Sequence, residues 1–223
     1  FDTIFTKSSN VGSIKVLEKT GIKKQRVFFN LLGFNNQTKI EGLNSINNSL
    51  PSSKDWNDVA SKTISYGYGL SITPISLVTK FASLVNGGYK IEPKIIREQK
   101  VIKKKVIKTE TSKKINKLLL KIVENGTGKQ AKVKGINIGG KTGTANKSKN
   151  KSGYFQDKII TSFIGTFPVE DPKYLLFILY DEPKNIEKKY YGGNTAAPVF
   201  SKIIKRIAPV LKILKKNNIK DNY

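Results

Sequence analysis

The chain has 223 residues, of which 38% are hydrophobic, and none of its apolar runs reaches the roughly 18 to 20 residues of a membrane span, which excludes a transmembrane helix within it. It contains no histidine and no cysteine, so Ser-His-Asp, Cys-His and histidine-zinc chemistry are excluded, and a catalytic base has to be Lys, Asp, Glu or Tyr. The net charge of +25 attracts polyanions over long range, but only three of the basic residues are arginines, and an AT-rich coding sequence would also produce this abundance of lysine.

The first part of the sequence is predicted to form helices joined by polar segments. A short helix is expected from Gly12 to about Gly21, where glycine ends it. Residues 35–58 are rich in Asn, Ser and Gly, and we interpret them as a long surface segment that Trp56 anchors.

A stronger helix prediction covers residues 73–88. Thr73 can cap the helix, Pro74 suits its first position, and a pair of glycines ends it. The expected buried face repeats at helical spacing and consists of Ile75, Val78, Ala82 and Val85.

The middle of the chain is predicted to contain an exposed strand and a second long helix. Residues 97–108 alternate between basic and apolar side chains, which is typical of an exposed strand or hairpin arm. The helix that follows ends at Asn125-Gly126 and has an apolar face of Ile115, Leu118, Leu119 and Ile122.

The last part changes to the pattern of strands, which are predicted at residues 136–145, 159–167 and 174–181. Short links favour antiparallel neighbours, and the third strand is apolar enough to be buried on both faces. A closing helix should start near Pro198 and end or kink at Pro209, before a polar tail from residue 215 that is expected to fray. The pattern predicts one α+β domain, with a mostly antiparallel sheet flanked by helices.

Two short motifs carry side chains suited to catalysis without histidine. The motif K-T-G-T at residues 141–144 lies on a predicted strand next to two glycines, which let a ligand or another backbone approach closely. Its lysine supplies charge, its threonine hydroxyls can bind a carboxylate, and an edge N–H can stabilise an oxyanion. The motif S-S-N at residues 8–10 is placed to cap the first helix. A polar turn and a helix cap explain the two motifs taken singly, but an S-D-N-like motif followed by K-T-G belongs to a known catalytic set.

Four blocks resemble, in order and spacing, the C-terminal part of the class B penicillin-binding proteins, and in particular the septal peptidoglycan D,D-transpeptidases. They are SSNVG from Ser8, SYGYGLSITPISL from Ser65, ENGTGKQAKVKGINIGGKTGTA from Glu124 and KYYGGNTAAPVF from Lys189. The resemblance extends from Lys7 to about Ile207. It implies a penicillin-binding, serine β-lactamase-like fold that is incomplete at the N-terminus, with residues 1–214 as the C-terminal portion of a transpeptidase domain.

The resemblance also implies functions for individual residues. Ser8 would belong to a proton relay near the leaving amine, Asn10 would hydrogen-bond the amide of the acyl group, and Lys141 would sustain the electrostatics of the relay. The hydroxyls of Thr142 and Thr144 would hold the terminal carboxylate, and the backbone N–H of Thr144 would form half of the oxyanion hole. Candidate substrate-binding residues are therefore Thr142, Gly143 and Thr144, with an aromatic wall of Tyr66, Tyr68, Tyr154, Tyr190 and Tyr191, although ordinary packing explains the tyrosines equally well.

The nucleophile motif S-x-x-K does not occur where this family has it. The one match in the sequence starts at Ser148, after K-T-G-T, and we interpret it as part of a polar turn. The chain begins with Phe1 and contains no methionine, so we expect a fragment or processed form whose catalytic serine and membrane anchor lie upstream.

The expected function is cross-linking of peptidoglycan stem peptides through an acyl-enzyme, without metal or cofactor, on the periplasmic face of the bacterial inner membrane. The expected partners are the stem peptide or its lipid-linked precursor, β-lactams, and a septal glycosyltransferase with other division proteins. Alternatives are a β-lactamase or D,D-carboxypeptidase of the same fold, a catalytically inactive division scaffold, and a basic nucleic-acid-binding module. The last would need aromatic residues interleaved with basic ones on one face, and the sequence has no such pattern.

Overall fold

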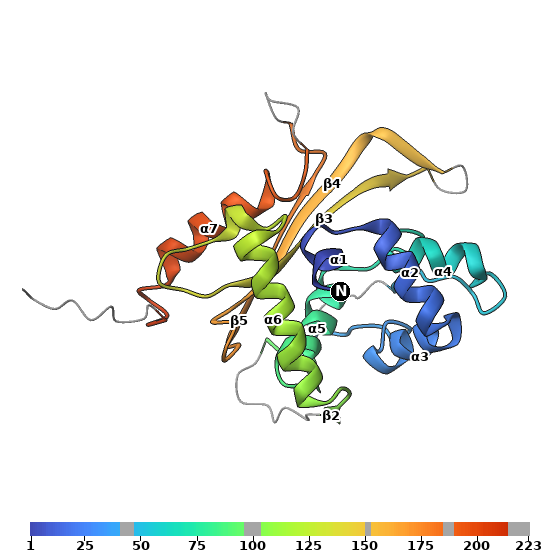
Figure 1. The fold of residues 1–223 in the computed structure, drawn as a ribbon, viewed down its shortest axis with the longest axis horizontal. Coiled ribbons are helices and arrows are strands. Elements are labelled where there is room, and N and C mark those ends of the chain that lie inside the picture. The colour runs from blue at the N-terminus through green and yellow to red at the C-terminus, as the bar shows by residue number, and fades with distance from the viewer. Residues whose placement is uncertain (41–46, 96–103, 150–152, 185–189, 214–223) are drawn as a thin grey trace, which may run out of the picture. The chain divides into compact units, whose positions relative to one another are not determined.

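The fold is described from a computed structural model, which covers residues 1–40, 47–95, 104–149, 153–184 and 190–213 (Figure 1). The chain forms two compact units, Phe1–Ile115 and Asn116–Tyr223, and each is described by itself. The expected polar tail lies outside the described residues, as does most of the predicted strand at 97–108. In the described part of the chain, no helix has the length and apolar character needed to cross a membrane.

The first unit is mainly helical. Its elements are α1 (Asp2–Thr6), α2 (Asn10–Thr20), α3 (Ile22–Leu32), α4 (Asp58–Ser65), α5 (Pro74–Val85), and the antiparallel pair β1 (Tyr89–Lys90) and β2 (Lys104–Lys105). Helix α2 contacts α3 and α4, and α5 contacts β1. The exposed β2 confirms the end of the predicted basic strand.

One end of each of two predicted helices of this unit lies where the sequence signals place it, although α2 begins at Asn10 and not at Gly12. Helix α2 ends at Gly21, which has the positive φ of 86° that glycine adopts without strain. Helix α5 has Thr73 as its N-cap, whose hydroxyl accepts a hydrogen bond from the N–H of Ser76, and Pro74 as its first residue. Both boundaries depend on local chemistry, which explains why the sequence predicts them.

The buried face of α5 differs from the predicted apolar face. Ala82 and Val85 are buried as expected, but Ile75 and Val78 are only half-buried. Polar side chains are buried as well, namely Ser76, Thr79, Lys80 and Ser83. Thr79 and Ser83 donate to carbonyls one turn earlier, and Lys80 Nζ donates to Thr38 Oγ1 over 3.0 Å. Hydrogen bonds within the helix and to a distant loop therefore allow this polar face to be buried.

Trp56 anchors the segment between α3 and α4, as predicted. Its side chain is buried, its Nε1 donates to Gln25 Oε1, and its ring meets the ring of Phe29 edge-on at 5.5 Å. The Nε2 of Gln25 in turn donates to the carbonyl of Ser61. The indole is therefore held by α3 and, through Gln25, is linked to α4.

The second unit is built on an antiparallel sheet. Its elements are the C-terminal part of α6 (Thr109–Asn125), the short helix η1 (Lys129–Ala131), β3 (Gly139–Ser148), β4 (Tyr154–Phe167), β5 (Tyr174–Asp181) and α7 (Ala196–Ile207). The strand order is β3-β4-β5, with Gly139 opposite Thr166 and Phe167 opposite Tyr174. Figure 1 shows α7 beside these strands, and it contacts β4, β5 and η1.

Aromatic rings fill the core of the second unit. Phe163 and Phe167 of β4 and Phe200 of α7 are almost completely buried. Phe163 and Phe200 meet at 4.8 Å in an edge arrangement, which is favourable for aromatic pairs. The closing helix therefore supplies the central side chain of this core, and Pro209 lies just after its end, as predicted.

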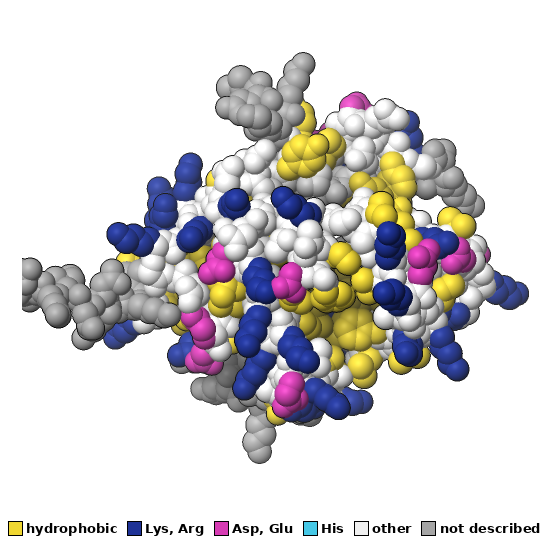
Figure 2. All heavy atoms as spheres, in the orientation of Figure 1, with side chains coloured by type: hydrophobic (Ala, Val, Ile, Leu, Met, Phe, Trp, Pro, Cys, Tyr) yellow, Lys and Arg dark blue, Asp and Glu magenta, His cyan; other side chains and the backbone are white. Residues whose placement is uncertain are grey.

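Helix α6 separates apolar from basic side chains. Leu119, Ile122 and Val123 are buried, whereas Lys113 and Lys117 are exposed. Figure 2 shows Lys and Arg side chains spread over the face in view, including the part over this helix. The lysines of α6 are thus solvated side chains on the polar face of an ordinary amphipathic helix.

The prediction that 174–181 is buried on both faces is wrong. Tyr174, Leu176 and Ile178 pack against the core, but Leu179 is 43% exposed and Tyr180 37% exposed. Among the described residues β5 pairs only with β4, so its other edge is unpaired there, and the C-terminal end of the strand is exposed. An apolar edge strand of this kind is a site for pairing with another chain.

We expect the isolated 223-residue chain to self-associate through β5. Replacing Leu179→Lys puts a charge on this strand and should raise the monomeric fraction, measured by analytical ultracentrifugation. Val210→Lys adds the same charge at a side chain that is 80% exposed and lies outside the sheet, and should change little. A wild-type chain that is a monodisperse monomer would contradict the prediction.

Candidate active site

The predicted site residues lie in both units, so the residues of each unit are described by themselves. Residues 8–10 connect α1 to α2 in the first unit. Ser9 is the N-cap of α2, and its Oγ accepts a hydrogen bond of 3.0 Å from the N–H of Gly12. The interpretation of this motif as a helix cap is therefore confirmed for Ser9, which leaves Ser8 and Asn10 on either side of the cap.

Ser8 has an unusual backbone conformation. Its φ is 52°, in the left-handed region that residues other than glycine seldom adopt. The N–H of Ser8 donates to the carbonyl of Phe5, and the N–H of Ser9 donates to that of Ile4. Such strain persists only where surrounding structure enforces it and is common at functional sites. Ser8 and Asn10 are both exposed, so their side chains can be reached by a ligand.

Tyr66 and Tyr68 form a pair just after α4. Their ring centroids are 5.8 Å apart and both side chains are half-buried. Gly67 and Gly69 have positive φ values of 96° and 75°, which bend the chain so that both rings lie close together.

The motif K-T-G-T lies in β3, as predicted, and β3 is an edge of the three-stranded sheet in the described part of the structure. Lys141 is opposite Ile164, and Thr144 is opposite Thr161. Thr142 and Thr144 are two residues apart, so their side chains share one face of the strand. An edge strand has a row of backbone groups on which an extended ligand can pair.

Both threonine hydroxyls of the motif are held by residues far away in the sequence. Thr142 Oγ1 lies 2.8 Å from Thr127 Oγ1, and either oxygen can be the donor. Thr144 Oγ1 accepts a hydrogen bond of 3.1 Å from the N–H of Gly192. Because Thr144 accepts this bond, its own proton remains available to a bound anion.

The chain at Gly192 packs directly against the motif. A Cβ on Gly192 would lie 2.3 Å from the carbonyl oxygen of Ser162 and 2.6 Å from that of Gly143, distances that real side chains do not reach. A Cβ on Gly193 would lie 2.5 Å from the carbonyl oxygen of Thr127. The two glycines therefore let residues 192–193 hold β3 and Thr127 in place by backbone contact.

Lys141 is the one motif residue with a strongly shifted pKa. Its Nζ donates to the carbonyl of Thr142 over 3.0 Å. Loss of water around the ammonium lowers the pKa of Lys141 to about 8. A lysine with this pKa can exchange a proton near neutral pH, which suits a proton relay.

The remaining predicted residues lie at the margins of the sheet. Tyr154 is the first residue of β4, is 40% exposed and is opposite Ser148. Tyr191 is 67% exposed, and its carbonyl accepts hydrogen bonds from the N–H groups of Asn194 and Thr195. Tyr190 is half-buried. Ser148 is the last residue of β3 and is paired with Tyr154, so its interpretation as turn material is wrong, because β3 continues past the predicted end at residue 145.

The sequence analysis did not identify three residues that support the site, namely Thr127, Thr161 and Thr195. Thr127 contacts Thr142, and Thr195 Oγ1 donates to Thr161 Oγ1 over 2.8 Å. Thr127 and Thr195 both sit in the glycine-containing blocks NGTG and GGNT, which is the only signal that could have indicated them. Their partners depend on tertiary contacts that no local pattern encodes.

Comparison with known proteins agrees with this description. A family model described as "Penicillin binding protein transpeptidase domain" matches residues 1–205. The chain is similar to "Stage V sporulation protein D" of Bacillus subtilis (strain 168), with 34% identity over 230 residues that cover 97% of this chain and 35% of that protein. It is also similar to "Probable peptidoglycan D,D-transpeptidase FtsI" of Caulobacter vibrioides (strain NA1000 / CB15N), with 32% identity over 231 residues that cover 97% of this chain and 39% of that protein. The chain therefore spans between 35% and 39% of the length of these two relatives.

Solved structures agree in fold. The transpeptidase domain of Burkholderia pseudomallei penicillin-binding protein 3 has a TM-score of 0.86 and 26% identity, covering 97% of this chain and 66% of that chain. Penicillin-binding protein 3 of Mycobacterium tuberculosis, solved with ampicillin, has a TM-score of 0.87 and 24% identity, covering 98% of this chain and 52% of that chain, a likeness of fold alone. The predicted α+β transpeptidase fold is confirmed.

The lowered pKa of Lys141 predicts how stability depends on pH. Between about pH 8 and pH 10.5 the unfolded chain keeps a proton that the folded chain has released, so the free energy of unfolding should rise with pH in this window. Below it both states are protonated, and the cost of burying the charge, on the order of 3 kcal/mol at most, is present in full.

Urea unfolding followed by far-UV circular dichroism tests this dependence on Lys141→Met. The stability difference between variant and wild type should change by up to about 3 kcal/mol across the window, because the variant has no charge to bury. Lys134→Met removes an exposed lysine and should leave the pH dependence as it is. Parallel curves for wild type and Lys141→Met would show that the ammonium is not desolvated.

Proposed function

Because the chain belongs to the penicillin-binding protein transpeptidase family, we propose that it is the C-terminal part of the catalytic domain of a peptidoglycan D,D-transpeptidase. The observation that carries the proposal is the K-T-G-T motif on an edge strand, with two hydroxyls held in place and one desolvated ammonium beside them. This arrangement provides what a peptide carboxylate needs from its binding site. On this proposal both units belong to a single transpeptidase domain that comprises residues 1–214.

The proposed substrate is the end of a stem peptide, whose C-terminal carboxylate binds to Thr142 and Thr144. A hydroxyl already fixed by a second hydrogen bond loses little rotamer freedom when it donates to an anion, so these hydroxyls are preorganised. The backbone N–H of Thr144 is proposed as one donor of the oxyanion hole, because edge N–H groups near the scissile carbonyl stabilise the charge that develops there.

The reaction we propose has two steps, and each forms and breaks one bond. A serine hydroxyl attacks the carbonyl between the last two residues of the stem peptide, the C–N bond breaks, and the serine proton passes to the departing amine. An amine from a neighbouring strand then attacks the ester carbon and releases the serine, which takes the proton back. Ser8 and Lys141 would relay these protons, and Asn10 would hold the acyl amide.

The attacking serine is proposed to lie in sequence outside this chain. Within the chain, the S-x-x-K match at Ser148 follows the K-T-G-T motif instead of preceding it, and its last two residues are outside the described part of the structure. The chain alone would then contain residues that bind the substrate but not the nucleophile that attacks it. The complete protein would bind β-lactams at that serine, because these inhibitors acylate the same nucleophile as the peptide.

The proposal also covers the tyrosines, the cellular role, the location and the partners of the protein. Tyr66, Tyr68, Tyr154, Tyr190 and Tyr191 are proposed as aromatic walls near the substrate. We propose that the protein acts in septal cell-wall synthesis, on the periplasmic face of the inner membrane, with a glycosyltransferase and other division proteins as partners. The relatives named as FtsI-type transpeptidases support this, and no observation favours a nucleic-acid partner.

Fluorescent penicillin distinguishes the complete protein from this chain. The full-length protein should become covalently labelled at a serine upstream of Phe1, whereas the 223-residue chain should not, as seen by gel fluorescence and peptide mass mapping. Covalent labelling of the chain by itself would overturn the location of the nucleophile. Absence of labelling in the folded full-length protein would favour a catalytically inactive scaffold.

Substituting Thr144→Val in the full-length protein should slow acylation about ten- to a hundredfold, because the carboxylate loses a charge-assisted hydrogen bond. Stopped-flow measurement of the acylation rate constant would give this ratio. Thr20→Val is the matched control, since Thr20 is exposed at the end of α2 and its hydroxyl donates to Val16 of its own helix. Equal rates for wild type and Thr144→Val would remove Thr144 from the substrate site.

A further inference from the structure

The first unit contains a polar pocket that the proposed reaction does not use. It has a volume of about 240 Å³ and lies between α3 and the segment that leads to Trp56. Arg26 supplies its charge, Asn30, Asn35 and Asn48 supply side-chain amides, and Trp56 and Leu50 supply apolar surface. The described residues that line it contribute one positive charge and no carboxylate.

Arg26 is an unusual residue in this chain. The chain has 41 Lys and Arg residues, and only Arg26, Arg97 and Arg206 are arginines. The Cζ of Arg26 lies 6.0 Å from the centroid of the Trp56 ring, within the range of a cation–π interaction. Gln25 and Phe29 hold that ring, so the guanidinium rests on a fixed surface with its N–H groups available at the edge.

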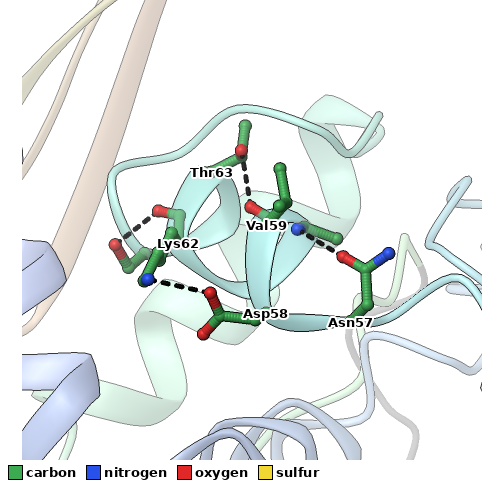
Figure 3. Close-up of polar contacts among 7 residues, drawn as sticks. Asn57, Asp58, Val59, Lys62 and Thr63 are labelled. Carbon is green, nitrogen blue, oxygen red and sulfur yellow. Dashed lines mark hydrogen bonds and ion pairs between the residues drawn. The ribbon is translucent and has the colours of Figure 1, made fainter.

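The next residue after Trp56 begins a well-anchored helix. Asn57 caps α4 by accepting a hydrogen bond of 3.0 Å from the N–H of Ala60, and Lys62 forms an ion pair of 2.8 Å with Asp58 one turn earlier (Figure 3). The wall of the pocket that contains Trp56 is therefore tied to a helix with a fixed first turn.

Asn48 forms a rigid wall of the pocket. Its Nδ2 donates to the carbonyl of Phe34 and to Ser76 Oγ, over 2.9 and 2.8 Å, and its Oδ1 accepts from the N–H of Thr73. These bonds use the polar groups of the side-chain amide. Asn48 therefore forms a wall of the pocket but does not offer a hydrogen bond to a ligand.

Asn30 and Asn35 have side-chain groups that can form hydrogen bonds with a ligand. The Nδ2 of Asn35 donates to the Oδ1 of Asn30. Both side chains are exposed, and within the described part of the chain the N–H groups of Asn30 Nδ2 and the carbonyl oxygen of Asn35 have no other protein partner, so a donor group and an acceptor remain available. A secondary amide, which has one N–H and one C=O, matches this pair.

The charge and shape of the pocket select the anion. A guanidinium binds a planar carboxylate through two parallel N–H···O bonds. A phosphate dianion would need further cations, and the described lining residues provide one. The volume is below the roughly 300 to 1,000 Å³ of common ligand pockets, so the ligand must be small.

We propose that this pocket binds the carboxylate of a small N-acylated amino acid, with Arg26 on the carboxylate and the Asn30–Asn35 pair on the neighbouring amide. The proposal does not depend on the transpeptidase function. It concerns residues of the first unit only.

Intrinsic fluorescence tests this proposal, because Trp56 is the single tryptophan of the chain and directly contacts the anchoring cation. The 223-residue chain is titrated with N-acetylglycine, and with N-acetylglycinamide as a ligand of the same shape without the carboxylate. N-acetylglycine should give a saturable change with a Kd on the order of 1 mM. The amide should bind at least about tenfold more weakly, because it cannot form the charged bidentate pair.

Two variants and one control identify the anchor. Arg26→Gln should weaken N-acetylglycine binding at least about tenfold, and Arg26→Lys, which keeps the charge but loses the planar fork, should weaken it severalfold. Lys24→Gln removes an exposed charge from the same helix and should leave the Kd unchanged. Circular dichroism confirms that each variant is folded, and if Arg26→Gln unfolds, the folded Arg26→Lys decides.

Several outcomes would overturn the proposal. They are a change that does not saturate, equal affinity for N-acetylglycine and its amide, unchanged binding by Arg26→Lys, or the same loss in Lys24→Gln. Tighter binding of inorganic phosphate than of N-acetylglycine would also overturn it, since the site would then be selective for a different anion.

Discussion

The second unit depends on one backbone contact, in which Gly192 lies against Gly143 of β3 and Ser162 of β4. No side chain fits at this position, so the chain crosses the paired strands at the closest distance that peptide groups allow. The contact brings the N–H of Gly192 to Thr144 and, three residues later, the hydroxyl of Thr195 to Thr161. The same segment leads into α7 and so delivers Phe200 to the core. The segment that contains Gly192 therefore connects the core, the closing helix and the candidate binding strand through direct contacts.

Desolvation of Lys141 opposes this stability. Removing water from an ammonium costs free energy, and the hydrogen bond from Nζ to the carbonyl of Thr142 offsets part of this cost. A hydrophobic residue would fill the same space with less cost. The retention of lysine there is understandable if the charge acts in a reaction, because functional groups are often held in environments that disfavour their charged form.

The features that could be predicted from the sequence are those with local causes. Thr73 and Pro74 define the start of α5, and Gly21 defines the end of α2, because caps and breakers act on the backbone next to them. The two motifs were correctly assigned to a helix start and an edge strand for the same reason. The buried polar face of α5 was not predictable, because Lys80 is satisfied by Thr38, a residue 42 positions away. The exposed end of β5 was missed because apolar composition indicates burial only when another element covers the strand.

The tight packing of β3 also limits which substitutions its glycines tolerate. A Cβ on Gly140 would lie 2.3 Å from Cζ of Phe163, and one on Gly143 would lie 2.4 Å from Oγ of Ser162. A side chain at Gly140 would therefore displace the buried Phe163 ring and the backbone of β4, whereas one at Gly143 would need only the Ser162 hydroxyl to move aside. Gly140 thus couples the edge strand to the aromatic core, because a side chain at this backbone position would displace the ring of Phe163, which packs against Phe200.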